Sequence, residues 1–453
     1  MICVLTFAAA AALQPLGTAA AAVAQPNLSD SVEPAVQLTL EEAVEIGTER
    51  SFKLQRSMRN ERIAVERVNG TKAGLGPRLD VGYGADQSQR YYDFKGTYDY
   101  NQGRPSFLTD LNANASYSID IAGVQKRQLQ QARLSKDATD VDLRQTRLDV
   151  SSDIRINYVQ ALRAQEQVDA DTQYLKQIEA LLERARVSQP TVVSFLETER
   201  ANAQQTLQGT KQNADLAFSN LRQTLRLRNN QPIELTSKLV NPAPLPSADQ
   251  LMRLAHDNRN DLKQADIRLK QARIQKIQAS DSRRPSLRAG LNAGYSLNGD
   301  YVTLGGDNHG RTRQAAALLN FNLPLFLYDG GQLKSQRNIA NIQAEQALAD
   351  AEEAKERAEN EVNQTMIGLD RAQQRLKALP DSNQARRSLT QAEQQMLAAS
   401  PTEAAGILAQ VTNARQNWRS SVLSRNDALT EFYQSYYRLQ RSVGTETIQQ
   451  FRD

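Results

Sequence analysis

The sequence has very little cysteine, histidine and aromatic residue. Its 453 residues include one Cys, two His and 6% aromatic residues. A single Cys excludes a disulfide within the chain and a zinc or iron–sulfur site built from cysteines. Two His are too few for a histidine metal cluster, and they make a His-based triad improbable. The composition therefore disfavours an enzyme, and we expect neither a metal nor a cofactor.

An excess of charge of one sign is also lacking. The chain has 55 Lys and Arg against 51 Asp and Glu, a formal net charge of +4. This near balance gives no reason to expect a nucleic-acid partner. The basic residues Lys126, Arg127, Arg283 and Arg284 flank predicted strand ends. Such positions favour a membrane interface over nucleic acid.

Long apolar runs are absent outside the N-terminus. Residues 1–24 contain no charged side chain, and the small residues at 22–24 precede Gln25 as at a cleavage site. We predict a signal peptide here. The alternative, a transmembrane anchor, is disfavoured by Gln14 and Pro15. No later stretch reaches about 18 apolar residues, so no membrane-spanning helix is predicted and the chain is expected to be exported.

The sequence does contain an internal repeat. Thr39 and Glu42 form a capping-box pattern, and Ser247 and Gln250 repeat it 208 residues later. The same spacing relates further identical pairs: Leu54 and Leu262, Pro77 and Pro285, Gly82 and Gly290, Asn112 and Asn320, Gly123 and Gly331. Near the end of each half, a Pro-Thr pair recurs at a spacing of 211 residues, at 190–191 and 401–402. We therefore predict a tandem duplication with repeats at 25–246 and 247–453.

Each repeat is predicted to run helix, two strands, long helix, turn, helix. The first repeat has helices at 40–73, 124–188 and 192–227, strands at 78–90 and 108–120, and a Pro-rich connector at 228–246. The second has helices at 248–282, 331–399 and 402–443, strands at 286–299 and 312–326, and a C-terminal tail. The 124–188 stretch lacks Pro and Gly and has the apolar spacing of a coiled coil. At about 1.5 Å per residue it would span about 97 Å. Pro380 should kink or break the helix at 331–399.

The strands alternate apolar and polar residues. Leu111 and Tyr117 in one strand, and Leu319 and Phe321 in another, are separated by Asn and Ser positions. Runs of about ten alternating residues are typical of lipid-facing barrel strands around a polar lumen. A soluble antiparallel sheet with one wet face would give the same pattern. The signal peptide and aromatic clusters near the strand ends favour the barrel. These aromatic residues are Tyr91, Tyr92, Phe94, Tyr98, Tyr100, Phe107, Phe326 and Tyr328.

Four strands are too few to close a membrane barrel. The smallest bacterial barrels have about eight strands, and open sheet edges are not tolerated in lipid. Several copies of the chain must therefore share one barrel.

The order of these features resembles the TolC-type outer membrane efflux proteins. The likeness rests on the capped start at 40–43 (LEEA), Pro77 and Pro285 before the first strand of each half, 323–326 (LPLF) followed by 329–331 (DGG), and two Pro-turned helical tips. The resemblance implies a homotrimer that is mainly α with membrane β: a 12-stranded outer membrane β-barrel, four strands per chain. It also implies a periplasmic α-helical coiled-coil tunnel, with residues 228–246 and the C-terminal segment as a belt around it.

The resemblance also assigns roles to the two helical tips. The tips comprise Ser188, Gln189, Pro190 and Thr191, and Ser400, Pro401 and Thr402. They are expected to form the periplasmic mouth and to contact an adaptor protein. The candidate residues lining the entrance are Glu403, Ala404, Ala405, Gly406 and Ala409. Family members often have a ring of Asp just after the inner tip, where this chain has Gly406 and Ala409, so a gate lined by small residues is the alternative.

The function implied by this resemblance is that of a passive exit duct. The duct would belong to a tripartite efflux or type I secretion system, coupled through the adaptor to a proton-driven or ABC-type inner-membrane pump. The runner-up is a non-transporting periplasmic or surface coiled-coil protein. Gly330 and Gly331 are glycines of the kind found in phosphate loops, but the segment lacks the Lys and the spacing of one, which favours a strand-to-helix turn.

Overall fold

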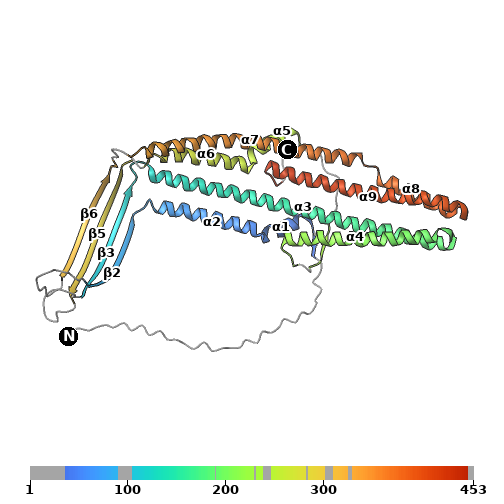
Figure 1. Ribbon diagram of the computed structural model, residues 1–453, viewed down its shortest axis with the longest axis horizontal. Helices are drawn as coiled ribbons and strands as arrows, with labels where there is room; N and C mark the ends of the chain where they lie inside the picture. The colour runs from blue at the N-terminus through green and yellow to red at the C-terminus, as the bar shows by residue number, and fades with distance from the viewer. Residues whose placement is uncertain are drawn as a thin grey trace, which may run out of the picture.

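The computed structural model describes residues 36–89, 105–188, 190–228, 231–237, 246–281, 284–300, 310–324 and 329–446. The molecule is elongated: a sheet forms one end, and long helices extend away from it (Figure 1). The predicted signal peptide at 1–24, Gln189, much of the connector at 228–246 and the last residues of the tail lie outside the described residues. So do most of the aromatic residues near the strand ends: Tyr91, Tyr92, Phe94, Tyr98, Tyr100, Phe326 and Tyr328.

Four antiparallel strands form the sheet. They are β2 (Arg78–Gln89), β3 (Pro105–Ile119), β5 (Ser286–Asp300) and β6 (Gly310–Asn322). Their order is β2-β3-β5-β6, so the two halves of the chain meet where β3 pairs with β5. Each half thus contributes one hairpin, and β2 and β6 are left as the edges.

Helices make up most of the chain. Those before the middle of the chain are α1 (Leu40–Arg50), α2 (Phe52–Ala73), α3 (Val124–Ser188) and α4 (Val193–Leu225). Those after it are α5 (Ala248–Asn258), α6 (Asn260–Gln278), α7 (Gln332–Ala378), α8 (Ser382–Ala398) and α9 (Pro401–Val443). A short parallel pair, β1 (Val36–Leu38) and β4 (Ile233–Leu235), lies beside them. The 65 residues of α3 span about 97 Å.

Some boundaries differ from the sequence prediction. The helix predicted at 40–73 is interrupted at Ser51, whose Oγ accepts from the Leu54 amide at 3.4 Å and so starts a new helix. The helix predicted at 248–282 is interrupted at Arg259 and ends at Gln278. The last strand ends at Asn322 instead of 326, since Pro324 has no N–H to donate to a ladder. The predicted break near Pro380 is confirmed, and Asp381 caps α8 by accepting from the Asn383 amide at 2.9 Å.

The helices lie side by side along the long axis. Next to the sheet the order of contacts is α2–α3–α6–α7, and beyond the middle of α3 it is α4–α3–α9–α8, as Figure 1 shows. Apolar contacts gather in three places and not in one core. One joins α1, α3 and α4 to the β1–β4 pair, the second lies at the far tips, and the third joins α5, α7 and α9. The outermost helices therefore have faces with no partner among the described residues.

Candidate functional site

One face of the sheet is apolar. Residues directly opposite on antiparallel strands share a face, and the register aligns Leu111 with Tyr83 and Tyr295. By the same register, Tyr117 shares its row with Leu319, and Phe321 occupies the next row toward the helices. The four residues predicted to face lipid are exposed by 49%, 45%, 73% and 58% in the order Leu111, Tyr117, Leu319, Phe321. They thus share one exposed face, interrupted near its far end by Thr109, by Gln87 and Gln89 on β2, and by Arg311 and Arg313 on β6.

The opposite face is mostly polar. Its residues include Asp80, Asp110, Asn112, Asn114, Asn292 and Asn320, with Leu108 and Leu318 as apolar exceptions. Asn112 Nδ2 donates to Asp110 Oδ2 at 3.1 Å. These two side chains lie against the backbone of β2 at its glycines. A Cβ atom on Gly82 would stand 2.6 Å from Asn112 Oδ1, and a Cβ atom on Gly84 would overlap Asp110. The sequence analysis did not identify Gly82 and Gly84 as the positions that leave room for Asn112 and Asp110. Their placement two residues apart, both on the polar face of the strand, was the available indication.

The two helical tips lie together at the end farthest from the sheet (Figure 1). The first is a short 3-10 turn, Pro190–Val192, and the second begins α9 at Pro401. Buried side chains join them: Leu181, Leu182, Val192, Leu196, Leu389, Met396, Val411 and Trp418. The side chains of Ser188, Thr191, Pro401, Thr402, Ala404 and Ala405 lie outside what the structure describes, whereas Gly406 and Ala409 are exposed.

Glu403, a candidate for lining the entrance, caps the start of α9. Its Oε2 accepts from Ser400 Oγ at 2.7 Å and from the Ser400 amide at 3.2 Å. These bonds complete a capping box at the start of α9. The hydroxyl and amide of Ser400 hold the pKa of Glu403 below its ordinary value. The assignment of Glu403 to the entrance stays a prediction.

A charged cluster lies beside the tips and links both halves of the chain. The fully buried guanidinium of Arg415 donates to Glu393 at 2.8 Å and to Glu199 at 3.3 Å. Tyr174 donates to the same Glu199 at 3.2 Å. Burial, and then the negative charge of Glu199, raise the pKa of Tyr174 to about 12. Arg419 contacts Asp171 at 2.7 Å and lies over the ring of Tyr174, lining a groove of about 620 Å³.

Sequence reasoning also missed Arg415. Its only signal is its position on the buried stripe of α9, four residues after Val411 and three before Trp418. An arginine at an apolar coiled-coil position implies buried carboxylates opposite it, but the sequence does not say which helices supply them.

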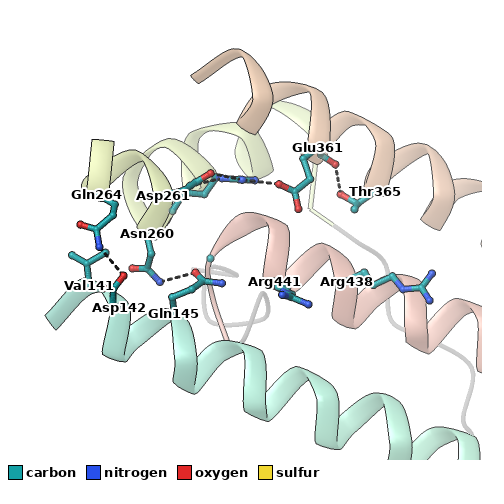
Figure 2. A pocket seen from close by; sticks show the side chains of 12 residues that line it. Val141, Asp142, Gln145, Asn260, Asp261, Gln264, Glu361, Thr365, Arg438 and Arg441 are labelled. Carbon is teal, nitrogen blue, oxygen red and sulfur yellow. Dashed lines mark hydrogen bonds and ion pairs between the residues drawn. The ribbon is translucent and has the colours of Figure 1, made fainter. Parts of the chain in front are cut away.

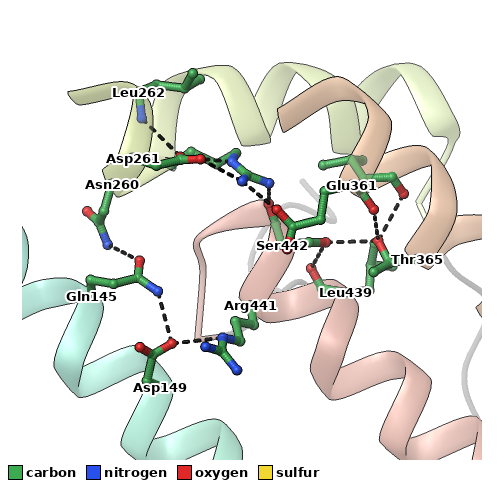
Figure 3. A network of polar contacts seen from close by, with 12 residues as sticks. Gln145, Asp149, Asn260, Asp261, Leu262, Glu361, Thr365, Leu439, Arg441 and Ser442 are labelled. Carbon is green, nitrogen blue, oxygen red and sulfur yellow. Dashed lines mark hydrogen bonds and ion pairs between the residues drawn. The ribbon is translucent and has the colours of Figure 1, made fainter. Parts of the chain in front are cut away.

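A second polar cluster lies at the middle of the helical region. Arg259 donates to Glu361 at 2.6 Å, to Asp261 at 2.7 Å and to the Ser442 carbonyl at 2.8 Å. These three partners are labelled in Figure 3. Burial alone would raise the pKa of Asp261, but the hydrogen bonds and charge of Arg259 outweigh it and the pKa lies below its ordinary value. On the other side of a cavity of about 540 Å³, Gln264 of α6 donates to Asp142 of α3 at 2.6 Å (Figure 2). The cluster therefore ties α3, α6, α7 and α9 together.

Basic residues at the junction of sheet and helices are paired. Arg127 contacts Asp281 at 2.6 Å and Arg284 contacts the same carboxylate at 2.9 Å. Arg284 also donates to the Ala122 carbonyl at 3.1 Å. These arginines thus fix the turns between strands and helices; Arg283 lies outside the described residues.

The described part of the chain has neither a metal-binding cluster nor a membrane-spanning helix. Within the described ranges, no group of three or more His, Cys, Asp or Glu is placed to hold a metal ion. His256 lies 3.4 Å from a single carboxylate, that of Glu359. No helix in the described part of the chain combines the length and apolarity needed to cross a membrane.

Comparison with known proteins gives consistent matches. A family model described as "Outer membrane efflux protein" matches residues 48–227 and 251–445. No curated protein matches the sequence. The fold is similar to the open state of the Neisseria gonorrhoeae MtrE outer membrane channel, with TM-score 0.70 and 16% identity over 90% of this chain and 89% of that one.

Two further channel structures have the same fold. The Campylobacter jejuni CmeC outer membrane channel has a TM-score of 0.66 and 17% identity, over 89% of this chain and 85% of that one. The outer membrane protein VceC from Vibrio cholerae has a TM-score of 0.64 and 19% identity, over 90% of this chain and 96% of that one.

Proposed function

The chain belongs to the outer membrane efflux protein family, and from this premise we propose that three copies form a passive exit duct through the outer membrane. Members of this family are transport channels and not enzymes. The duct would be part of a tripartite efflux or type I secretion system. The runner-up, a non-transporting coiled-coil protein, has no support from the family match.

The observation that carries the proposal is that the described part of the chain has two free edges, one on each side, in the sheet and in the helices next to it. In the sheet the edges are β2 and β6. In the adjoining helices they are α2 and α7. These two helices expose large apolar side chains by 45–54%: Met58 and Ile63 on α2, and Ile339, Ile342 and Leu348 on α7. One edge meeting the opposite edge of the next copy is a head-to-tail contact, which closes into a ring when the rotation between copies is a whole fraction of a turn.

Closure of the ring would give both edges and both faces of the sheet a suitable environment. The β6 edge of one copy would pair with the β2 edge of the next, leaving no open edge in lipid. The apolar face with Leu111, Tyr117, Leu319 and Phe321 would then contact lipid, and the polar face with Asn112 would line the lumen.

The tips would form the periplasmic mouth in this assembly. They lie a full helix length from the sheet, about 97 Å along α3. We assign the adaptor contact to Ser188, Gln189, Pro190, Thr191, Ser400, Pro401 and Thr402. We assign the entrance to Glu403, Ala404, Ala405, Gly406 and Ala409. An inner-membrane pump, proton-driven or ABC-type, would supply the energy.

The proposal is tested by the mass and conductance of the purified protein. Extraction in mild detergent should give a particle of three chains, each of 50.4 kDa before the signal peptide is removed. The particle should migrate as an oligomer until heated and should conduct ions in a planar bilayer. A folded monomer in detergent, or an oligomer that never conducts, would contradict the proposal.

A further inference from the structure

Two arginines stand near the far end of the mostly apolar face of the sheet. Along β6 this face presents Phe321, Leu319, two alanines, and then Arg313 and Arg311. Arg313 is exposed and makes no ion pair with any other described residue, whereas the side chain of Arg311 lies outside what the structure describes. Both arginines lie at the end of the sheet away from the helices.

The height of these arginines on the sheet agrees with a lipid interface. Eight positions separate Phe321 from Arg313, which is about 27 Å along a strand. With a strand tilt of about 40°, this distance corresponds to about 21 Å along the membrane normal, close to the height of the apolar band of a barrel, about 25 Å. Arginine is strongly destabilising at the middle of that band and nearly neutral at its boundary.

The neighbouring residues mark the same boundary. The row of Arg313 continues through Tyr295 and Leu111 to Tyr83. Tyrosine is enriched where apolar and headgroup regions meet. If the helices point into the periplasm, this row lies at the outer leaflet.

A hollow lies directly on the helix side of this row. It has a volume of about 490 Å³ and is lined chiefly by small residues, Ala113, Ala115, Ala293, Ala315 and Ala317. Bulkier residues stand beyond it at both ends, Leu319 toward the helices and Arg313 toward the far end. The surface thus combines an apolar groove with a positive charge at its outer end.

We propose that Arg313 binds the phosphate of an outer-leaflet lipid whose acyl chain lies in the alanine-lined hollow. The inference rests on the proposed function, because it needs the sheet in a membrane with its apolar face outward. A guanidinium presents two parallel N–H donors that match two phosphate oxygens. A trimer would have three such sites.

The test measures lipid retained by the purified oligomer. The Arg313→Gln variant is compared with wild type after extraction in mild detergent, with bound bis-phosphorylated lipid A counted by native mass spectrometry. Arg288→Gln is the matched control, because Arg288 is an exposed arginine on the polar face of the same sheet. We expect about tenfold less lipid A on Arg313→Gln, since charge-assisted bonds are lost, and no loss on the control.

A second measurement needs no variant. Delipidated wild-type oligomer is titrated with lipid A and with lipid A whose phosphates have been removed enzymatically. Preference for the phosphorylated form supports the site. Equal binding of both forms, or equal retention by wild type and Arg313→Gln in an intact oligomer, overturns this inference and leaves the proposed duct standing. If the wild-type protein forms no oligomer at all, both this inference and the proposed duct are overturned.

Discussion

At the scale of single residues, the charged groups buried among the helices are satisfied by opposite charges. Arg415 has no exposed side-chain surface, yet two carboxylates from α4 and α8 reach it. Replacing one member of such a group leaves the others buried without compensation, which costs more than the pair contributes when intact. Substitution of such a residue therefore tests whether the helical tips are packed as they are in the structure.

Arg415→Met is expected to destabilise the helical tips. Glu199 and Glu393 would remain only 11% and 22% exposed without a cation beside them. We expect a loss of about 3 kcal/mol in the free energy of unfolding, measured by thermal or urea unfolding followed by circular dichroism. The control is Arg186→Met: Arg186 lies near the same tip but is 45% exposed in its pairs with Glu183 and Glu197. That change should cost less than about 1 kcal/mol, and equal losses would reject the buried cluster.

Tyr174 should make the tips sensitive to alkali. Burial and Glu199 raise its pKa from 10.0 to about 12, so the folded state holds the phenol proton more tightly than the unfolded chain does. The resulting stabilisation is complete below pH 10 and disappears as the pH rises through about 12. Melting temperatures between these limits should fall more steeply for wild type than for Tyr174→Phe. Parallel curves would show that Tyr174 does not titrate in a buried environment.

At the scale of elements, the two faces of the sheet should respond differently to charge. Phe321 and Asn320 are neighbours on β6 but lie on opposite faces. Ala317→Arg, on the face of Phe321 and midway between Phe321 and Arg313, should block membrane assembly at a cost of about 2–4 kcal/mol. Phe321→Arg, at the boundary of the apolar band, should cost only about 0–1 kcal/mol. Asn320→Arg should assemble and change only the conductance. Similar assembly defects for Ala317→Arg and Asn320→Arg would reject the barrel interpretation.

Local sequence signals predicted most elements well, because they depend on short-range chemistry. The 124–188 helix has the predicted bounds, since nothing in it disfavours a helix. Strands β2 and β5 begin at 78 and 286 as predicted, where apolar and polar residues start to alternate. The break at Arg259 was not predicted, and the Arg259 side chain donates to the Ser442 carbonyl 183 residues away, a contact that no local signal indicates.

The candidate site was predictable to a lesser degree. The alternation of strand residues placed Leu111, Tyr117, Leu319 and Phe321 on one face, as the register shows. The prolines marked both helical turns. The clusters around Arg415 and Arg259 join segments far apart in the chain, and such pairings cannot be read from spacing along one helix.

At the scale of the whole molecule, the sheet and the tips are mechanically separate. They lie at opposite ends of the long axis, and α3 alone runs nearly the whole way between them (Figure 1). A change confined to the tips should therefore leave the closure of the sheet intact. Opening at the tips would then take the form of small shifts between packed helix pairs, with two discrete arrangements.

The last prediction uses this separation to test the entrance. Cys introduced at Ala404 or Ala405 lies just after the second tip, on the first turns of α9. The native Cys3 lies in the predicted signal peptide, so the mature chain would have no other thiol. If the tips of three chains converge, their Cα atoms can approach within about 7 Å and oxidation should form disulfides between subunits. Conductance should fall, while the heat stability of the oligomer, which depends on the sheet, should not change.

Ala404→Ser under the same oxidant is the control, because it has nearly the same size as the thiol variant and cannot cross-link. Reducing agent should restore conductance to the cross-linked protein, which separates closure of the entrance from damage to the fold. Cross-linking without a change in conductance would show that the second tips meet but do not form the narrowest passage. Absence of cross-links between chains would show that they do not meet, and the entrance would then have to be formed by the turn at Pro190–Val192.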